Sequence, residues 1–202
     1  MACVKSTPER GAAGGAPLYQ LKITLKWSKP PIWRRVVVPA DMRLDRLHSV
    51  IQVVMGWTDS HLHQFIVGTR VDRVFFGQTD LGLDDMGDML DEKRYTLAHL
   101  AVQPKQKFIY EYDFGDSWEH EVVVEKLLPP DPALKHPVCL EGANASPPED
   151  CGGIPGYYNL LEIMADPKHP EHAETKEWLG GELKPGECDT DDVNMHLKRI
   201  KA

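Results

Sequence analysis

The sequence predicts an α+β fold: a mainly antiparallel sheet with a long helix packed on it, followed by a helical C-terminal part. Residues 19–27 alternate apolar and polar side chains, which is typical of a half-buried antiparallel strand. Residues 44–55 repeat apolar side chains at three- and four-residue spacing, which predicts an amphipathic helix against that sheet. Strand patterns come first and helical patterns last, without the strand–helix alternation of a parallel α/β fold.

Composition limits the function classes. With 202 residues, of which 42% are hydrophobic, the chain is long enough for one packed domain, which we place at residues 18–202. Residues 1–17 are rich in glycine and alanine and are predicted to be a disordered tail. The formal net charge of -8 disfavours a broad nucleic-acid-binding surface, although seven lysines and arginines fall between residues 22 and 46.

Neither a membrane span nor a secretory leader is predicted. No apolar run approaches the ~20 residues that a bilayer span requires, and no apolar signal segment is recognised. We therefore expect a cytoplasmic protein without membrane contact. In that reducing compartment, four widely spaced cysteines without a C-x-x-C pair are expected to be free thiols.

The other elements of the N-terminal half follow from local patterns. A second strand is predicted at 32–38, and Gly56 is placed to end the long helix in a left-handed conformation. Further strands are predicted at 62–67 and 70–76. The acidic stretch at 79–92 does not have the acid spacing of an EF-hand loop, and we expect it to be a solvated loop.

A hairpin is predicted between residues 107 and 127. A three-residue loop would pair residue 114 with 118 and residue 112 with 120, which gathers the aromatic side chains and His120 on one buried face. That register places four carboxylates on the opposite face: Glu111, Asp113, Glu119 and Glu121. Like charges opposite one another cost about 0.2–1 kcal/mol per pair, so we expect neighbouring lysine or arginine, solvent or a cation to offset them.

The C-terminal third begins with a long stretch that lacks periodicity. Residues 129–156 are rich in proline and glycine, and a connection of this length is more often functional than a short one. Helices are predicted at 157–165 and 170–179, and a last helix is predicted to begin at residue 189 or 190.

Five landmarks in this order resemble a known family. They are Trp33-Arg34-Arg35, Met55-Gly56-Trp57, the segment 61–65, the segment 112–118, and the segment 147–153 with the sequence PPEDCGG. Together they are similar to the Ri-plasmid Orf-three-like family (plasmid pRiA4b ORF-3-like proteins), over about residues 18 to 200.

The resemblance implies an α+β domain with no established activity, carried on plasmids, beside mobile elements and in bacterial and archaeal chromosomes. Some relatives have a resolvase label. That label does not transfer, because the chain shows neither the serine-nucleophile segment of a serine recombinase nor a basic C-terminal helix-turn-helix.

Two histidines indicate a metal site as one alternative. His61 and His63 are two residues apart at a strand start, so their side chains are predicted to project to one face and share a divalent ion. Glu149, Asp150, Cys151 or His120 could complete the ligands. The structural alternative is a pair of half-exposed histidines that hold a turn, with His120 buried in the core near Trp118.

Paired carboxylates indicate acid–base chemistry as another alternative. Asp113 with Asp116, or Glu149 with Asp150, could act if one carboxylate were desolvated. The structural alternative is that the aspartates and Gly115 form a tight turn, and that residues 150–153 are a loop clamped against the hairpin with Cys151 buried.

We rank an accessory or protein-interaction module first, a metal-dependent or other hydrolytic enzyme second, and a DNA-associated protein third. No cofactor is predicted, apart from the divalent metal of the second hypothesis. The candidate binding residues come from the histidine pair, the hairpin turn and the acidic loop: His61, His63, Asp113, Asp116, Trp118, Asp150 and Cys151. Exposed aromatic side chains at Trp27, Tyr157 and Tyr158 could form a recognition groove for an unknown protein partner or a nucleic acid, and the net negative charge disfavours the nucleic acid.

Overall fold

The computed structural model describes residues 15–79 and 88–201, so most of the tail predicted at residues 1–17 lies outside the described residues. An eight-stranded sheet has the order β5-β4-β3-β6-β7-β1-β2-β8, and only β4 and β5 pair in parallel. Its strands are β1 (Leu18–Leu25), β2 (Trp33–Pro39), β3 (His63–Val67), β4 (Val74–Gly77), β5 (Leu90–Asp91), β6 (Lys107–Tyr112), β7 (Trp118–Leu128) and β8 (Val138–Ala143). The predicted α+β class is confirmed.

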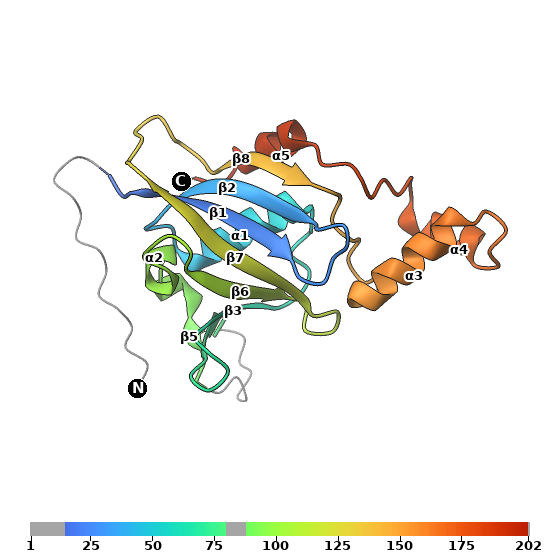
Figure 1. Ribbon diagram of the computed structural model, residues 1–202, viewed down its shortest axis with the longest axis horizontal. Helices are drawn as coiled ribbons and strands as arrows, with labels where there is room; N and C mark the ends of the chain where they lie inside the picture. The colour runs from blue at the N-terminus through green and yellow to red at the C-terminus, as the bar shows by residue number, and fades with distance from the viewer. Residues whose placement is uncertain (1–14, 80–87, 202) are drawn as a thin grey trace.

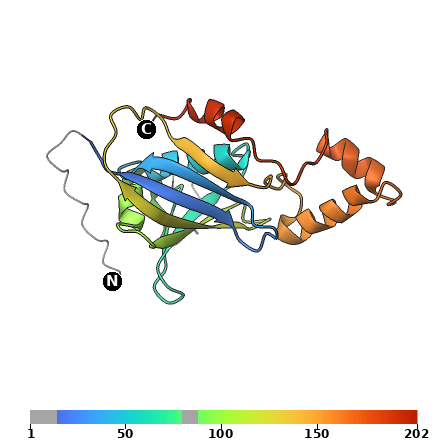
Figure 2. The ribbon, with the colours of Figure 1, turned by 45° about the horizontal axis from the view of Figure 1, so that its top comes forward.

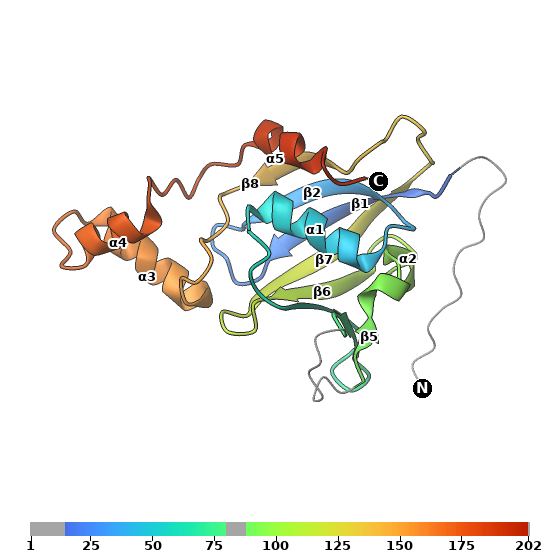
Figure 3. The same ribbon diagram turned by 180° about the vertical axis from the view of Figure 1, so that it is seen from behind.

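The helices form a layer on one face of the sheet and an arm beyond it. Helix α1 crosses that face, and α5 lies beside it near β8 (Figure 3). Helices α3 and α4 form a helical hairpin that projects away from the sheet, here called the arm (Figures 1 and 2). The bounds are α1 (Leu44–Met55), the 3-10 helix η1 (Glu92–Arg94), α2 (Leu97–Leu100), α3 (Gly153–Ala165), α4 (His172–Leu179) and α5 (Thr190–Leu197). None of the helices in the described ranges is long and apolar enough to cross a bilayer.

Helix α1 packs its apolar face against the sheet and is bonded to β2 at its C-terminal end. Its apolar stripe, which includes Leu47 and Ile51, is fully buried, as the spacing predicted. The helix ends at Gly56, which has a φ of 73° and returns its N–H to the last turn. The buried Arg34 side chain of β2 donates from Nε to the carbonyl oxygen of Val54 at 2.9 Å, which satisfies a carbonyl of that last turn that has no donor within the helix.

The hairpin of β6 and β7 confirms the predicted faces but not the predicted loop. Tyr112 pairs with Trp118 and Tyr110 with His120, so the loop has five residues instead of three. The shift is two residues, which preserves side-chain parity and leaves the rings inside. The longer loop arises because Asp113 and Ser117 both adopt left-handed backbone conformations, at φ of 57° and 53°. Phe114, predicted to be buried, is 42% exposed as a result.

The carboxylates on the outer face of the hairpin have separate partners. Lys26, directly after β1, pairs with Glu119 at 2.5 Å, and Lys107 of β6 pairs with Glu121 at 2.6 Å. Glu111 accepts hydrogen bonds from the amide of Gln64 and the hydroxyl of Ser117. Lysine from a neighbouring strand therefore supplies part of the predicted compensation. Asp113, which was expected on this face, lies in the loop instead.

Two regions differ from their predicted state. The stretch 129–156 contains β8, a strand that pairs with β2 but lacks clear alternation in its sequence. The stretch 79–92 was expected to be a solvated loop, but Glu92 is 1% exposed; residues 80–87 of that stretch lie outside the described residues.

The outer edge of β8 is covered by one side chain of α5. Asn194 accepts a hydrogen bond from the backbone N–H of Cys139 and donates to the carbonyl oxygen of the same residue, both at 2.8 Å. A strand edge normally leaves these backbone groups unpaired. Asn194 therefore occupies the position that a ninth strand would take at Cys139.

We predict that Leu47→Ala lowers the free energy of unfolding by about 3 kcal/mol, because it leaves a cavity under α1. Arg46→Ala is the matched control on the exposed face of the same helix and should change it by less than about 0.5 kcal/mol. Urea unfolding measures both values. Equal losses in the two variants would contradict the packing of α1 described above.

Candidate functional site

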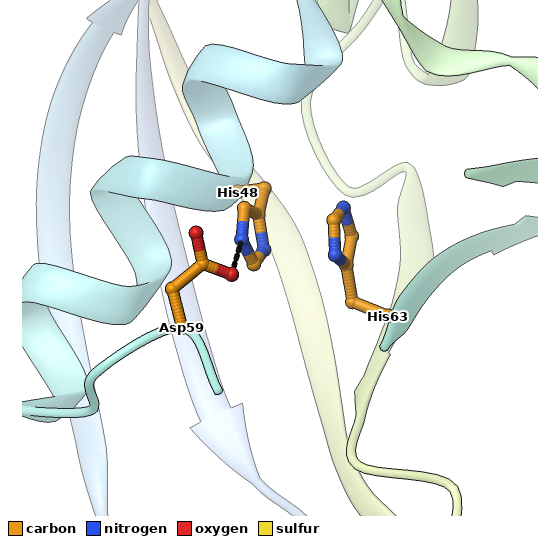
Figure 4. A group of neighbouring side chains, drawn as sticks. All are labelled: His48, Asp59 and His63. Atoms are coloured by element: carbon orange, nitrogen blue, oxygen red, sulfur yellow. Dashed lines mark hydrogen bonds and ion pairs between the residues drawn. The ribbon is translucent and has the colours of Figure 1, made fainter. Parts of the chain in front are cut away.

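The most unusual buried feature is a pair of stacked histidine rings. His48 of α1 and His63 of β3 lie with ring centroids 3.5 Å apart and planes within 6° of parallel (Figure 4). His48 is 4% exposed and His63 is 2% exposed. Because one ring comes from the helix and the other from the sheet, the stack joins the two layers.

Hydrogen bonds define the role of each atom around His48. Its Nε2 lies 2.7 Å from Oδ1 of Asp59, and a carboxylate only accepts, so Nε2 carries the proton. Its Nδ1 then accepts from the hydroxyl of Tyr110 at 2.8 Å, and the side-chain amide of Gln52 donates to that hydroxyl oxygen at 3.0 Å. The carbonyl oxygen of the Gln52 side chain accepts from the backbone N–H of Asp59, which closes the circuit.

His63 has a carboxylate partner of its own. Its Nε2 lies 2.7 Å from Oε2 of Glu92, and both side chains are almost fully buried. Its Nδ1 is buried and has no hydrogen-bond partner among the described residues. Each stacked ring is thus oriented by one acid, Asp59 for His48 and Glu92 for His63.

Burial and the neighbouring His63 ring lower the pKa of His48 to about 4, and Asp59 opposes this shift. Burial also lowers the pKa of His120 to about 4. His120 is fully buried, contacts the edge of Trp57 and has no hydrogen-bond partner at either ring nitrogen among the described residues. Both rings are therefore neutral at pH 7.

The stack does not fit a shared metal ion. A metal binds imidazole in the plane of the ring, about 2 Å from the nitrogen. With parallel planes about 3.5 Å apart, an ion in the plane of one ring lies outside the plane of the other. His48, Asp59 and His63 lie close together for structural reasons, and we assign them no metal.

The structure also separates the two histidines that were expected to share an ion. His63 is the first residue of β3, whereas His61 precedes the strand, so the alternation assumed for the pair does not apply. His61 lies beside Asp113 and Asp150 instead. This corrects the expectation of a His61–His63 metal site.

The PPEDCGG segment packs against the loops that follow α1 and β6, and we call residues 147–153 the clamp. The carbonyl oxygen of Pro147 accepts from the Trp57 indole at 2.9 Å. The Glu149 carboxylate accepts from Thr58 and from the hydroxyl of Tyr112. The Asp116 carboxylate accepts from the N–H of Gly152 at 3.1 Å. The interpretation of this segment as a loop clamped against the hairpin agrees with these contacts.

Three of the candidate residues meet where the clamp reaches the hairpin turn. Nε2 of His61 is 3.1 Å from Oδ1 of Asp150 and 3.7 Å from Oδ2 of Asp113. One ligand atom of each residue lies within 4.8 Å of the other two. Asp113 is buried, and the Asp150 side chain is 69% exposed, so this cluster faces solvent on one side.

Trp118, Cys151 and Ser117 were also considered for binding or catalysis, and their surroundings indicate structural roles. Trp118 is fully buried beside Trp57 and offers no surface to a ligand. Burial, together with the charges of Asp116 and Asp150, raises the pKa of Cys151 to about 12, so its thiol is protonated and a poor nucleophile at neutral pH. The hydroxyl of Ser117 donates to Glu111 and not to a histidine, so no serine triad forms there.

A family model described as plasmid pRiA4b ORF-3-like protein matches residues 17–192. The chain belongs to this family. A curated relative from Sinorhizobium fredii, named uncharacterized protein y4hQ, is 45% identical over 168 residues, which is 82% of each chain. The predicted resemblance is confirmed.

A solved structure from the archaeon Methanosarcina mazei Go1 has the same fold. It is named as a protein of unknown function, MM3350, and it superposes with a TM-score of 0.79 at 35% identity, covering 89% of this chain and 98% of its own. Neither relative's name states an enzyme activity.

The sequence contained a signal for the buried cluster. His48 lies in the apolar stripe of α1, and a histidine in a buried stripe needs polar partners. Glu92 at the end of an acidic stretch was one available partner. Asp59, from the turn after α1, and Gln52, from α1 itself, supply the rest of the cluster. Only the tertiary structure brings Asp59 to His48 and Glu92 to His63.

We predict that Gly153→Ala lowers the free energy of unfolding by about 3 kcal/mol. Gly153 has a φ of +66°, and a Cβ there would lie 2.5 Å from the backbone oxygen of Asp116, so the clamp would have to separate from the hairpin. Gly181→Ala is the control, because a Cβ at that position would have no described atom within 4 Å. Thermal or urea unfolding measures both, and a neutral Gly153→Ala would contradict this contact.

We predict that the protein loses stability as the pH falls from about 6.5 towards 4. The folded state keeps His48 and His120 neutral, whereas the unfolded chain binds protons on both in this window. At pH 5 the expected loss is about 2 kcal/mol for each histidine. His120→Phe removes one contribution without removing a described hydrogen bond, so unfolding at pH 7.5 and pH 5 should show a smaller difference than in the parent chain. An unchanged difference would contradict the prediction.

Proposed function

We propose that the protein is an interaction module whose arm binds a basic segment of a partner protein. The supporting observation is a groove of about 470 Å³ between α3, α4 and the clamp. Its apolar lining includes Leu160, Ile163 and the half-exposed Trp178. Its charged lining residues are all acidic: Asp150, Glu171 and Glu174.

The charge of the arm specifies the partner. Residues 153–179 contain five acidic residues and two lysines, and Asp150 of the clamp adds a further carboxylate to the groove. A segment with lysine or arginine beside an apolar side chain would meet carboxylates at the rim and aliphatic side chains at the floor. Aromatic anchors surrounded by polar groups are common in protein-binding surfaces.

The placement of the arm also supports binding. Helix α4 has no buried residue, and Trp178 is 51% exposed. Figures 1 and 3 show the arm reaching beyond the layer formed by the sheet and α1. The exposed Trp178 side chain makes no contribution to the core around the sheet, so it is available for contact with a partner.

A nucleic-acid partner has less support. Arg34 is buried and donates to backbone carbonyl oxygens, and Arg35 is paired with Glu125 and Glu141. Arg43 is paired with Asp45. Lys26 is likewise paired with Glu119, so four of the seven basic residues between 22 and 46 are paired or buried within the chain, and the net charge of -8 opposes phosphate binding.

We predict that peptides selected on the full chain from a random displayed library are enriched in lysine or arginine next to a large apolar residue. A fluorescent copy of such a peptide should bind Glu171→Gln/Glu174→Gln at least about tenfold more weakly, a loss of about 1.4 kcal/mol. Binding to the parent chain should weaken between about 0.15 M and about 1 M salt, because exposed charges are screened. Fluorescence anisotropy measures each affinity.

Glu177→Gln is the matched control, because Glu177 lies on the same helix but does not line the groove. Its affinity should equal that of the parent chain. Enriched peptides without basic residues, or equal binding by Glu171→Gln/Glu174→Gln, would overturn the proposed partner.

A further inference from the structure

The cluster of His61, Asp113 and Asp150 has unsatisfied bonding capacity. Nε2 of His61 is buried and makes no hydrogen bond of ordinary geometry, although Oδ1 of Asp150 is only 3.1 Å away. Oδ2 of Asp113 lies 3.7 Å from the same nitrogen, beyond hydrogen-bonding distance. One nitrogen and two carboxylate oxygens thus converge without forming a good hydrogen bond to each other.

The charge of the cluster also lacks compensation. Within residues 15–79 and 88–201, neither Asp113 nor Asp150 forms an ion pair with lysine or arginine. Their histidine partner is shared between them, and the carboxylates of Asp116 and Glu149 belong to the same turn and clamp. A bound cation would offset this concentration of negative charge.

The donor atoms fit a divalent metal ion. One imidazole nitrogen and two carboxylate oxygens are ligands that Zn²⁺ and Mn²⁺ both accept, at about 2 Å from the ion. A tetrahedral ion with bonds of about 2 Å holds its ligand atoms about 3.3 Å apart, and Nε2 of His61 already lies 3.1 Å and 3.7 Å from the two carboxylate oxygens.

We propose that His61, Asp113 and Asp150 bind one divalent cation. The ion takes Nε2 of His61 and one oxygen from each aspartate, and its remaining positions face solvent beside Asp150. Three protein ligands with open positions are the arrangement that lets a metal hold water or a further ligand. Unlike the His48–His63 stack, this set contains a single imidazole, so no second ring plane constrains the position of the ion.

The supporting structure holds these ligands from three separate segments. Asp113 is fixed by the hairpin turn, where its Oδ1 accepts from the N–H of Gly115 at 2.9 Å and leaves Oδ2 free towards His61. Asp150 is carried by the clamp, and the ring of His61 rests edge-on against Tyr112 at 5.7 Å. A cation here would tie the clamp to the hairpin and to the start of β3.

The test is a Mn²⁺ titration of the chelator-treated full chain at pH 7.5. The concentration of free Mn²⁺ is measured at each step by electron paramagnetic resonance. We expect one saturable Mn²⁺ per chain. Asp113→Asn, Asp150→Asn and His61→Gln should each weaken binding at least about tenfold. Asparagine tolerates the left-handed backbone at residues 113 and 150, and its amide oxygen can still accept from Gly115, so these variants keep the fold.

Asp192→Asn is the matched control, because Asp192 also lies beside a histidine, His196, at 3.6 Å but without a second carboxylate. Its Mn²⁺ binding should be unchanged. Absence of saturable binding below about 1 mM, the weak end of protein cation sites, would overturn the proposal, as would equal binding by the three ligand variants. Glu171→Gln/Glu174→Gln should bind Mn²⁺ normally, which separates this site from the peptide groove.

Discussion

The stack of His48 on His63 is the constraint on which the rest of the structure depends. It joins α1 to the sheet through polar rings, so each ring nitrogen inside the protein needs a partner or costs about 1–3 kcal/mol. Asp59 and Glu92 supply partners, and both come from outside the two elements that carry the rings: Asp59 from the turn after α1 and Glu92 from η1. The turn after α1, the start of β3 and the short helix η1 are therefore located by one buried cluster. Apolar packing alone would tolerate a small slide of the helix, whereas hydrogen bonds of 2.7 Å do not.

Periodicity in the sequence was sufficient to predict the layers of the fold. Alternation identified β1, the two strands of the hairpin and their buried face, and three- to four-residue spacing identified α1 with its end at Gly56. Periodicity could not predict the length of the hairpin loop, because a two-residue shift preserves parity and the left-handed backbone of Asp113 and Ser117 has no distinct signal. It also missed β8, whose strand character comes from pairing with β2 and not from its own pattern.

Candidate residues were predictable as types, but their neighbours were predictable only in part. His61 and Asp150 were singled out, yet only the folded clamp brings them together, and Asp113 joins them because its turn removes it from the outer face of the hairpin. His63 has the chemistry of a ligand but lies in the core, where Glu92 and His48 occupy its surroundings. Asp150 belongs both to the cation cluster and to the groove of the arm. The two proposed surfaces are therefore adjacent, and the root of the arm is where an ion and a partner would lie close to each other.

The contact of Asn194 with Cys139 has a consequence for assembly. A free β-strand edge is a template on which another chain can add itself, and proteins that leave it open tend to aggregate or to recruit extended peptides. Here an amide side chain takes the place of that incoming backbone, bonding the same donor and acceptor that an added strand would use. Growth of the sheet is blocked at that point. Association with other molecules is thereby directed away from strand addition at β8 and towards side-chain surfaces.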